Sequence, residues 1–122
     1  MRGIELNPKQ VELMFGVAAS ELGIRGELAR PTVKTRLKRS FVRFSLMFPN
    51  SCRMDEMIPA LWIHLGGMDR ICEIKEKIKP ECLEVDLVLP IKGSEEQEGG
   101  FLSTSTLAEL CLLGVTLSFQ FV

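Results

Sequence analysis

The sequence predicts a single α+β domain over residues 1–122, a two-layer sandwich in which short helices pack on one face of a mainly antiparallel sheet. One observation is the order of its segments: strand, helix, two extended segments, two helices, two extended segments, helix, strand. A second is the length of 122 residues, which fits one hydrophobic core. The third is that no internal linker is long enough to divide the chain into two domains.

The first helix has a clear start and a clear stop. Asn7 can cap the free N–H groups of a helix, and Pro8 at the first helical position has no hydrogen bond to lose. Val11 and Phe15 follow at helical spacing, and Gly16 offers a C-terminal stop. We therefore expect a helix that ends at Gly16 rather than a longer one.

The extended region after residue 32 changes its buried side part-way along. Its apolar residues alternate in two sets of opposite parity, Val33, Leu37 and Phe41 on one side and Val42, Phe44, Leu46 and Phe48 on the other. The change falls near residues 39–41. It predicts a bulge, a bend or the meeting of two strands at that point.

Two helices follow in the middle of the chain. The first has an apolar face formed by Met54, Ile58, Leu61, Trp62 and Leu65, and a Gly pair closes it. Asp69 is expected to cap the second, with Glu73 and Lys77 as an exposed i, i+4 pair and Pro80 as its stop. The buried stripe of this second helix is Ile71, Ile74 and Ile78.

The last third of the chain predicts strand, loop, helix and strand. Apolar residues alternate with Glu84 and Asp86 over residues 83–89, which is typical of a half-buried antiparallel strand with an acidic outer face. A polar loop over 92–100 leads to Thr106 and Glu109, spaced as the capping box of a helix. The final strand is expected to turn four residues toward the core, Val115, Leu117, Phe119 and Phe121.

Several of these segments together resemble the bacterial family catalogued as domain of unknown function 4279. They are the stretch from Asn7-Pro8 to Gly16, the pair Gly26-Glu27, the basic approach to SFVRFSL, and the C-terminal FLSTSTLAELCLLGVTLSFQF. The resemblance covers nearly the whole chain. It implies a small cytoplasmic α+β domain with no assigned activity and supplies no catalytic residues.

The composition is that of a globular protein without a targeting or membrane segment. Hydrophobic residues make up 46% and charged residues 25% of the chain, which excludes disorder and low complexity. Arg2, Glu5 and Lys9 interrupt the stretch that a signal peptide would need. The longest uncharged run, LCLLGVTLSFQFV, is shorter than the roughly 20 residues that span a bilayer. We expect a cytoplasmic protein that does not contact membranes.

The sequence predicts no metal site, no cofactor and no catalytic residues. Four cysteines are scattered without a C-x-x-C pair, so we expect free and mostly buried thiols. His64 is the only histidine, and no cysteine lies within seven residues of it. An enzyme that uses Glu84, Asp86 or His64 is kept as an alternative, because Glu84 and Asp86 are two apart on one strand face. It would require these groups to share a pocket.

A basic stretch is the most distinctive feature of the chain. Residues 25–43 contain seven Lys and Arg against one Glu, a charge of +6, whereas the rest of the chain carries −7. The candidate binding face within it consists of Lys34, Arg36, Lys38, Arg39, Phe41 and Arg43. Such a face can steer an anionic partner, and Arg39, Phe41 and Arg43 would suit a nucleic-acid base stacked between phosphate contacts.

Two interpretations of the basic stretch stay open at this point. It could be the outer face of a strand whose charges are neutralised by Glu84 and Asp86 on a neighbouring strand. It could instead bind nucleic acid, although the pI of 5.9 is far below the value of about 9 typical of such domains. The geometry between Glu84 or Asp86 and the residues Lys34, Arg36 and Lys38 decides between them.

The function that the sequence favours is a non-catalytic interaction or accessory module, with a protein partner or a second copy of itself. The terminal VTLSFQFV contains no charge to protect it at the edge of a sheet. It must therefore be central in its sheet or be paired with another chain. A homodimer would satisfy the second condition, and nucleic-acid binding through residues 33–43 is the alternative function.

Overall fold

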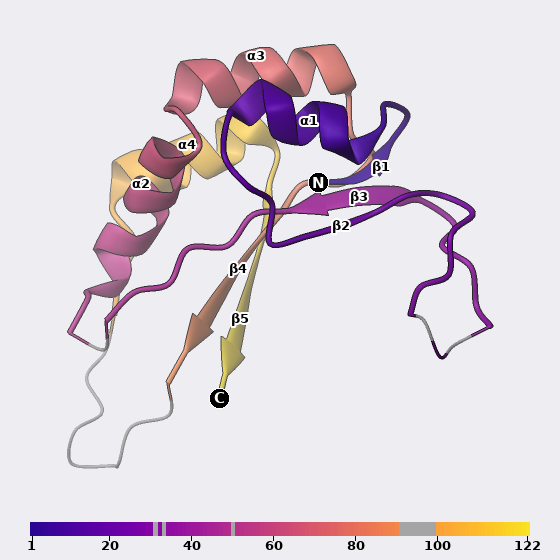
Figure 1. Cartoon of the computed structure of the whole chain (residues 1–122). Coiled ribbons are helices and arrows are strands. Elements are labelled where there is room, and N and C mark those ends of the chain that lie inside the picture. Colours follow the sequence, from indigo (N-terminus) through magenta and orange to yellow (C-terminus); the bar gives the residue numbers. More distant parts are fainter. Residues whose placement is uncertain (31, 33, 50, 91–99) are drawn as a thin grey trace.

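The computed structural model describes residues 1–30, 32, 34–49, 51–90 and 100–122. Within them the chain forms four helices and five strands, which confirms the α+β class (Figure 1). In chain order they are β1 (Arg2–Ile4), α1 (Pro8–Phe15), β2 (Glu21–Gly23), β3 (Ser40–Arg43), α2 (Met54–His64), α3 (Met68–Ile78), β4 (Glu84–Leu89), α4 (Thr104–Leu113) and β5 (Thr116–Phe121). Val33 and most of the expected polar loop lie outside the described residues.

The strands form two sheets that meet at one point. β1, β3 and β2 make an antiparallel sheet in the order β1-β3-β2, and β4 pairs with β5. An antiparallel bridge joins them, in which Arg2 N donates to Cys82 O at 3.0 Å and Cys82 N donates to Arg2 O at 3.1 Å, and Glu81 N donates to Gly3 O at 3.2 Å beside it. The first residue of β1 is thereby linked to the segment that leads into β4.

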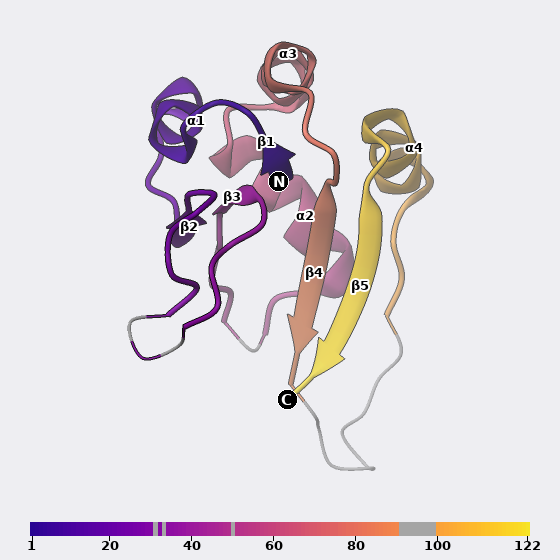
Figure 2. The ribbon, with the colours of Figure 1, turned by 90° about the vertical axis from the view of Figure 1, so that its right-hand side faces the viewer.

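The direction of β4 differs from the sequence prediction. β4 and β5 are parallel, with Glu84 opposite Thr116 and Leu89 opposite Phe121, and Figure 2 shows them side by side and pointing the same way. The alternation of buried and exposed residues along β4 is as expected, but it reports only that one face is buried. Because α4 carries the chain back between β4 and β5, the two strands run in the same direction.

The core lies between the strands and the helices, which gather on one side of the molecule (Figure 1). Val42 of β3 is 1% exposed and faces α1, whose Phe15 is also 1% exposed. The Phe15 and Phe44 rings pack edge to face with centroids 4.9 Å apart. Other buried members of the core are Ile4, Val11, Ile58, Trp62, Leu65, Ile71, Ile74, Ile78, Val85, Leu87, Leu110 and Leu113.

The predicted first helix and the predicted change of side are both confirmed. Asn7 Oδ1 accepts a hydrogen bond from Lys9 N at 2.9 Å, and Gly16 adopts the left-handed conformation at φ 71° that ends α1. Val42 points to the core, whereas Phe41 and Leu37 lie on the opposite face of the sheet. The change of side therefore falls at the start of β3.

Two predicted helix caps are wrong by a few residues. α3 begins after Gly67, so that Asp69 lies in its first turn rather than at its cap. α4 is capped by Ser103, whose Oγ accepts a hydrogen bond from Thr106 N at 3.2 Å. Thr106 is buried within the first turn of the helix, where it supports the true cap.

The predicted burial of the end of β5 is also wrong. The pairing of Leu87 with Phe119 and of Leu89 with Phe121 turns both Phe side chains toward the helix side of the sheet. They are nevertheless 46% and 59% exposed, respectively. Figure 2 gives the reason, because α4 lies beside the start of β5 and the end of the strand extends beyond it.

The cysteines are free, as expected, but they are less buried than expected. Cys82 and Cys111 are exposed, and Cys52 and Cys72 are half-buried. Cys82 is exposed because it pairs with Arg2, which lies on the sheet face opposite the helices. The apolar character of cysteine led us to expect burial, but it does not indicate on which face of a sheet a given cysteine lies.

Candidate functional site

The structure brings together four of the six residues of the predicted binding face. Lys38, Arg39, Phe41 and Arg43 line a shallow hollow of about 370 Å³ on the sheet face opposite the helices. Its lining is completed by Leu37 and by Arg2 from β1. We call this site, formed by Arg2, Leu37, Lys38, Arg39, Phe41 and Arg43, the cationic hollow.

The other two predicted residues, Lys34 and Arg36, do not line the hollow. The chain folds back on itself before β3, with Ala29 N donating to Thr35 O at 2.9 Å and Leu37 N donating to Glu27 O at 2.8 Å. Within this turn Arg36 Nη1 donates to Gly26 O at 2.7 Å. Lys34 and Arg36 therefore belong to a local hairpin-like segment rather than to a continuous strand face.

Arg2 is a member of the hollow that the sequence did not reveal. It lies directly opposite Phe41 in the pairing of β1 with β3. Residues opposite each other on antiparallel strands point to the same face, so this register places the Arg2 guanidinium beside the basic stretch. Nothing in the local sequence around Arg2 indicates this pairing, because it depends on contacts between segments about forty residues apart.

The floor of the hollow is apolar and depends on a glycine. Gly23 of β2 lies opposite Phe41 of β3. A Cβ atom at Gly23 would lie 2.6 Å from Leu37 Cδ1 and closer still to Phe41 Cε1. The Phe41 ring and the Leu37 side chain can therefore lie flat against β2 only because residue 23 has no side chain.

Two of the four cations form ion pairs at the rim. Arg39 Nε lies 3.2 Å from Glu81 Oε2, and Arg43 Nη1 lies 2.8 Å from Glu21 Oε2. All four side chains are more than half exposed, and exposed pairs of this kind contribute only about 0–1 kcal/mol to stability. Among the described residues, no carboxylate lies within ion-pair distance of Arg2 or Lys38.

The pKa of the Met1 amino group depends on the charged residues around it, two of which line the hollow. Its nitrogen donates a hydrogen bond to Val42 O at 3.1 Å. Burial lowers the pKa of this amino group below its usual 8.0, and the positive charges of Arg2 and Arg43 lower it further. Glu84 acts in the opposite direction and raises this pKa. The amino group thus lies between a positive and a negative region.

Glu84 and Asp86 do not neutralise the basic stretch. The strand paired with β4 is β5, where Glu84 lies opposite Thr116 and Asp86 lies opposite Ser118. Asp86 Oδ1 accepts a hydrogen bond from Ser118 Oγ at 3.0 Å. Of the two interpretations left open by the sequence, the cross-strand contact with Lys34, Arg36 and Lys38 is therefore the one that the strand pairing does not support, because β1 and the bridge at Cys82 separate β3 from β4.

The residues kept for a catalytic alternative lie on different elements of the fold. Glu84 and Asp86 are exposed on the outer face of β4, and His64 is the last residue of α2. None of the three lines the cationic hollow or the larger hollow described next. This arrangement gives no support to the version of the enzyme hypothesis that needed them to share one pocket.

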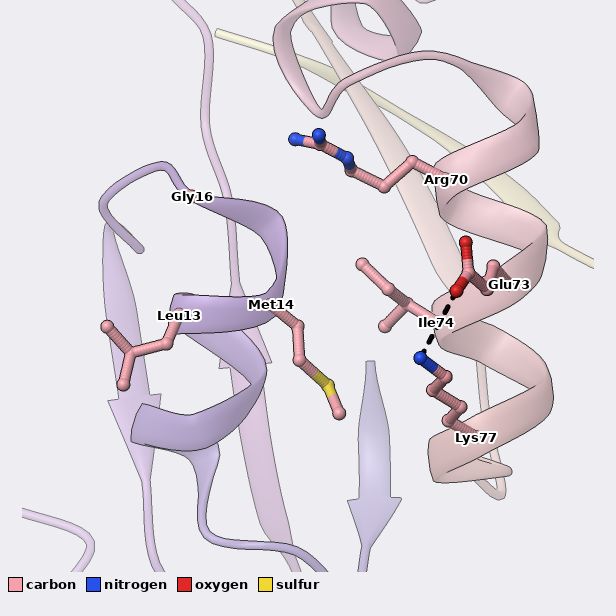
Figure 3. A pocket seen from close by; sticks show the side chains of 7 residues that line it. All are labelled: Leu13, Met14, Gly16, Arg70, Glu73, Ile74 and Lys77. Carbon is pink, nitrogen blue, oxygen red and sulfur yellow. Dashed lines mark hydrogen bonds and ion pairs between the residues drawn. The ribbon is translucent and has the colours of Figure 1, made fainter.

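A larger hollow of about 470 Å³ lies between α1 and α3 (Figure 3). Its polar groups already have partners, since Lys77 Nζ donates to Glu73 Oε1 at 3.1 Å and Arg70 Nη1 donates to Phe15 O at 3.4 Å. The first contact confirms the predicted i, i+4 pair. In Figure 3 Arg70 reaches toward the end of α1, where a cation is favourable next to free carbonyl groups. We regard this hollow as the seam between two packed helices.

Comparison with known protein families, with curated proteins and with solved structures gave no match to this chain. The resemblance to domain of unknown function 4279 therefore stays a prediction. In the part of the chain that the structure describes, no helix is long and apolar enough to cross a membrane. Within the same part, no three side chains of His, Cys, Asp or Glu are grouped so that they could hold a metal ion.

Proposed function

We propose that the chain is a bacterial, cytoplasmic interaction module without catalytic activity, and that its cationic hollow binds an acidic side chain of a protein partner. The observation that carries this proposal is the combination of an apolar floor with a cationic rim on the face opposite the helices. Aromatic and Arg side chains supply much of the binding energy at protein interfaces. A partner residue such as Asp or Glu next to a large apolar residue would match both parts of the hollow.

The charge balance of the hollow favours an anionic partner. Its four cations face two carboxylates, Glu21 and Glu81, which leaves two positive charges without a counter-charge among the described residues. Because the existing ion pairs are exposed and weak, Arg39 or Arg43 can exchange its partner for an incoming carboxylate at little cost. An Arg can hold such a carboxylate through two parallel hydrogen bonds.

The surroundings of the hollow favour a single acidic side chain over a polyanion. Cys82 shares the outer face with Arg2, and by strand alternation Glu84 and Asp86 lie on the same face. A nucleic-acid strand, with a phosphate at every nucleotide, would meet these acids beyond the hollow. Nucleic acid is the second candidate because Phe41, flanked by cations, could stack on a base.

Peptide selection tests this proposal without knowledge of the natural partner. Peptides selected from a random displayed library against the wild-type protein are expected to combine Asp or Glu with a large apolar residue. Their affinity is expected to fall at least about tenfold in the double variant R2E/K38E, about 1.4 kcal/mol, because two cations of the hollow become acids. Added salt should weaken binding to the wild type.

The matched control also replaces two cations with glutamates, but at positions outside the hollow. Lys9 and Lys79 are exposed and lie outside the hollow, so the K9E/K79E variant should bind the selected peptides like the wild type. Equal loss in both double variants, or selected peptides without acidic residues, would overturn the proposal. Tighter binding of an oligothymidine single strand than of any peptide, lost when Arg36 and Lys38 are both neutralised, would favour the second candidate.

A further inference from the structure

One edge of β5 faces away from β4, and its residues do not line the cationic hollow. Thr116 N donates to Leu83 O at 3.0 Å, and Val122 N donates to Leu89 O at 3.0 Å. In a parallel pair only alternate residues of a strand bond to a given neighbour, so the even-numbered residues of β5 bond to β4. The N–H and C=O groups of Leu117, Phe119 and Phe121 therefore point to the opposite edge, which no described strand pairs.

This edge lacks the features that normally prevent strands from pairing with other chains. Edge strands are usually short or carry Lys, Pro or a bulge. β5 has six residues, TLSFQF, with no charge and no proline, and its pairing with β4 is regular throughout. The outer edge of the other sheet, β2, has only three residues and begins with the charged Glu21.

The side chains on the helix side of β5 become less covered along the strand. Leu117 is half-buried, Phe119 is 46% exposed and Phe121 is 59% exposed. The start of the strand lies beside α4, and its end extends past that helix (Figure 2). If a second β5 ran in the opposite direction along this edge, its start, which lies beside its own α4, would be next to the exposed end of the first β5.

We propose that β5 pairs with β5 of a second copy, antiparallel and about a two-fold axis at Phe119. In this register Phe119 faces its own equivalent, and Leu117 faces Phe121 of the other copy. All three open residues then form hydrogen-bonded pairs, and the two sheets merge into one of the order β4-β5-β5-β4. A two-fold axis at Leu117 would instead leave Phe121 without a partner.

The second copy is the occupant that the geometry of the edge favours. Its α4 would lie near Phe121 of the first copy, and α4 has exposed apolar side chains at Leu107 and Leu112. No charged residue lies on β5 to repel its equivalent. Asp86 and its equivalent would be three strand spacings apart, about 14 Å, which exceeds the Debye length of about 8 Å at physiological salt.

Amide hydrogen exchange of the wild-type protein provides a test that needs no variant. Exchange at Leu117, Phe119 and Phe121 should slow as the protein concentration rises, because pairing with a second copy protects these amides, which no described strand pairs. Exchange at Ser118 and Gln120 should be slow at every concentration, because these residues bond to β4. Concentration-independent exchange at the three odd positions, with a monomer by sedimentation throughout, would rule out the dimer.

A charge swap tests the register. The F119K and F119E variants should each be monomeric at concentrations where the wild type is dimeric, since each places like charges opposite each other. An equimolar mixture of the two should restore the dimer in sedimentation, with an apparent affinity at least about tenfold above that of either variant alone.

The matched pair for this experiment is F121K and F121E. In the proposed register residue 121 faces residue 117, so mixing these two variants should not restore the dimer. Thermal melts check that all four variants are folded, which is expected because both Phe side chains are about half exposed. Folded F119 variants that stay monomeric when mixed, or equal rescue by the F121 pair, would refute the register. Loss of the peptide site described above would leave these results unchanged.

Discussion

The two sheets of the molecule present different surfaces to a partner. The antiparallel sheet has strands of three or four residues, and its outer face carries the cationic hollow. The parallel sheet has two strands of six residues, an acidic outer face with Glu84 and Asp86, and an uncharged open edge. The first sheet offers side chains, whereas the second offers backbone hydrogen-bonding groups.

This difference explains how a chain of nearly neutral charge can hold a strongly basic stretch. The positive residues lie on one sheet and the acids of β4 on the other, and the bridge between Arg2 and Cys82 lies where the two sheets meet. The acids of β4 therefore do not neutralise the basic residues, of which Arg39 pairs with Glu81 and Arg43 with Glu21. Charge segregation between two halves of a small domain favours binding and orientation of charged partners over stability.

The largest expected effect is a loss of stability, which should differ between substitutions beside the two sheets. Phe15, 1% exposed, packs against Phe44 beside the antiparallel sheet, whereas Phe119 of the parallel sheet is 46% exposed. F15A should lower the free energy of unfolding by about 3–5 kcal/mol, because it leaves a cavity in the core. F119A should lower it by less than about 1 kcal/mol in the monomer.

Urea denaturation at a concentration where the protein is monomeric measures both variants. The midpoint should fall strongly for F15A and little for F119A, with a similar dependence on denaturant. A loss of stability in F119A as large as that in F15A would show that β5 is covered in the monomer. It would thereby remove the difference between the two sheets on which the proposed dimer rests.

The α+β class and the limits of several elements were predictable from the sequence because local signals decide them. Asn7, Pro8 and Gly16 set the limits of α1 through capping and backbone conformation, and alternation identified β4. The direction of β4 was not predictable from that alternation, because a buried face looks the same in parallel and antiparallel pairs. The exposure of Phe119 and Phe121 depends on where α4 ends in space, which a residue type does not encode.

The candidate site was predicted in part. Four of its residues were identified because they lie close together in the basic stretch, around the point before β3 where the buried side of the chain changes. They are Lys38, Arg39, Phe41 and Arg43. Arg2 lines the hollow because β1 pairs with β3. Lys34 and Arg36 do not line it, because the chain folds back before β3. Membership in a site formed by several strands is decided by register, which one sequence leaves open.

An intermediate effect is expected from a substitution beneath the hollow. G23A adds a Cβ that collides with Phe41 and Leu37, so the ring must move away from β2. We expect a loss of about 1–3 kcal/mol in the free energy of unfolding, as is usual for overpacking. Binding of the selected acidic peptides should weaken although no charge has changed.

The matched control for G23A lies on the outer face of the other sheet. S118A removes the hydrogen bond to Asp86 but leaves the hollow untouched. It should change the free energy of unfolding by less than about 0.5 kcal/mol and leave peptide binding unchanged. Wild-type stability and peptide affinity in G23A would show that the position of the Phe41 ring does not matter for the hollow.

The smallest expected effect concerns the Met1 amino group, which responds to both sheets. Its pKa is lowered by burial and by Arg2 and Arg43, and raised by Glu84. Between the lowered pKa and 8.0 the unfolded chain binds more protons at this group than the folded chain. This group's contribution to the free energy of unfolding should therefore rise as the pH rises through that window, and acetylation of the amino group should remove it.

Titration of the Met1 amino group by NMR measures the two fields separately. E84Q removes a negative charge, so the pKa of the amino group should fall further below 8.0. R43Q removes a positive charge, so the pKa should move back toward 8.0. Detectable shifts in both variants would show that a positive charge of one sheet and a negative charge of the other both act on this amino group. An unchanged pKa in either variant would show that the corresponding charge does not reach it.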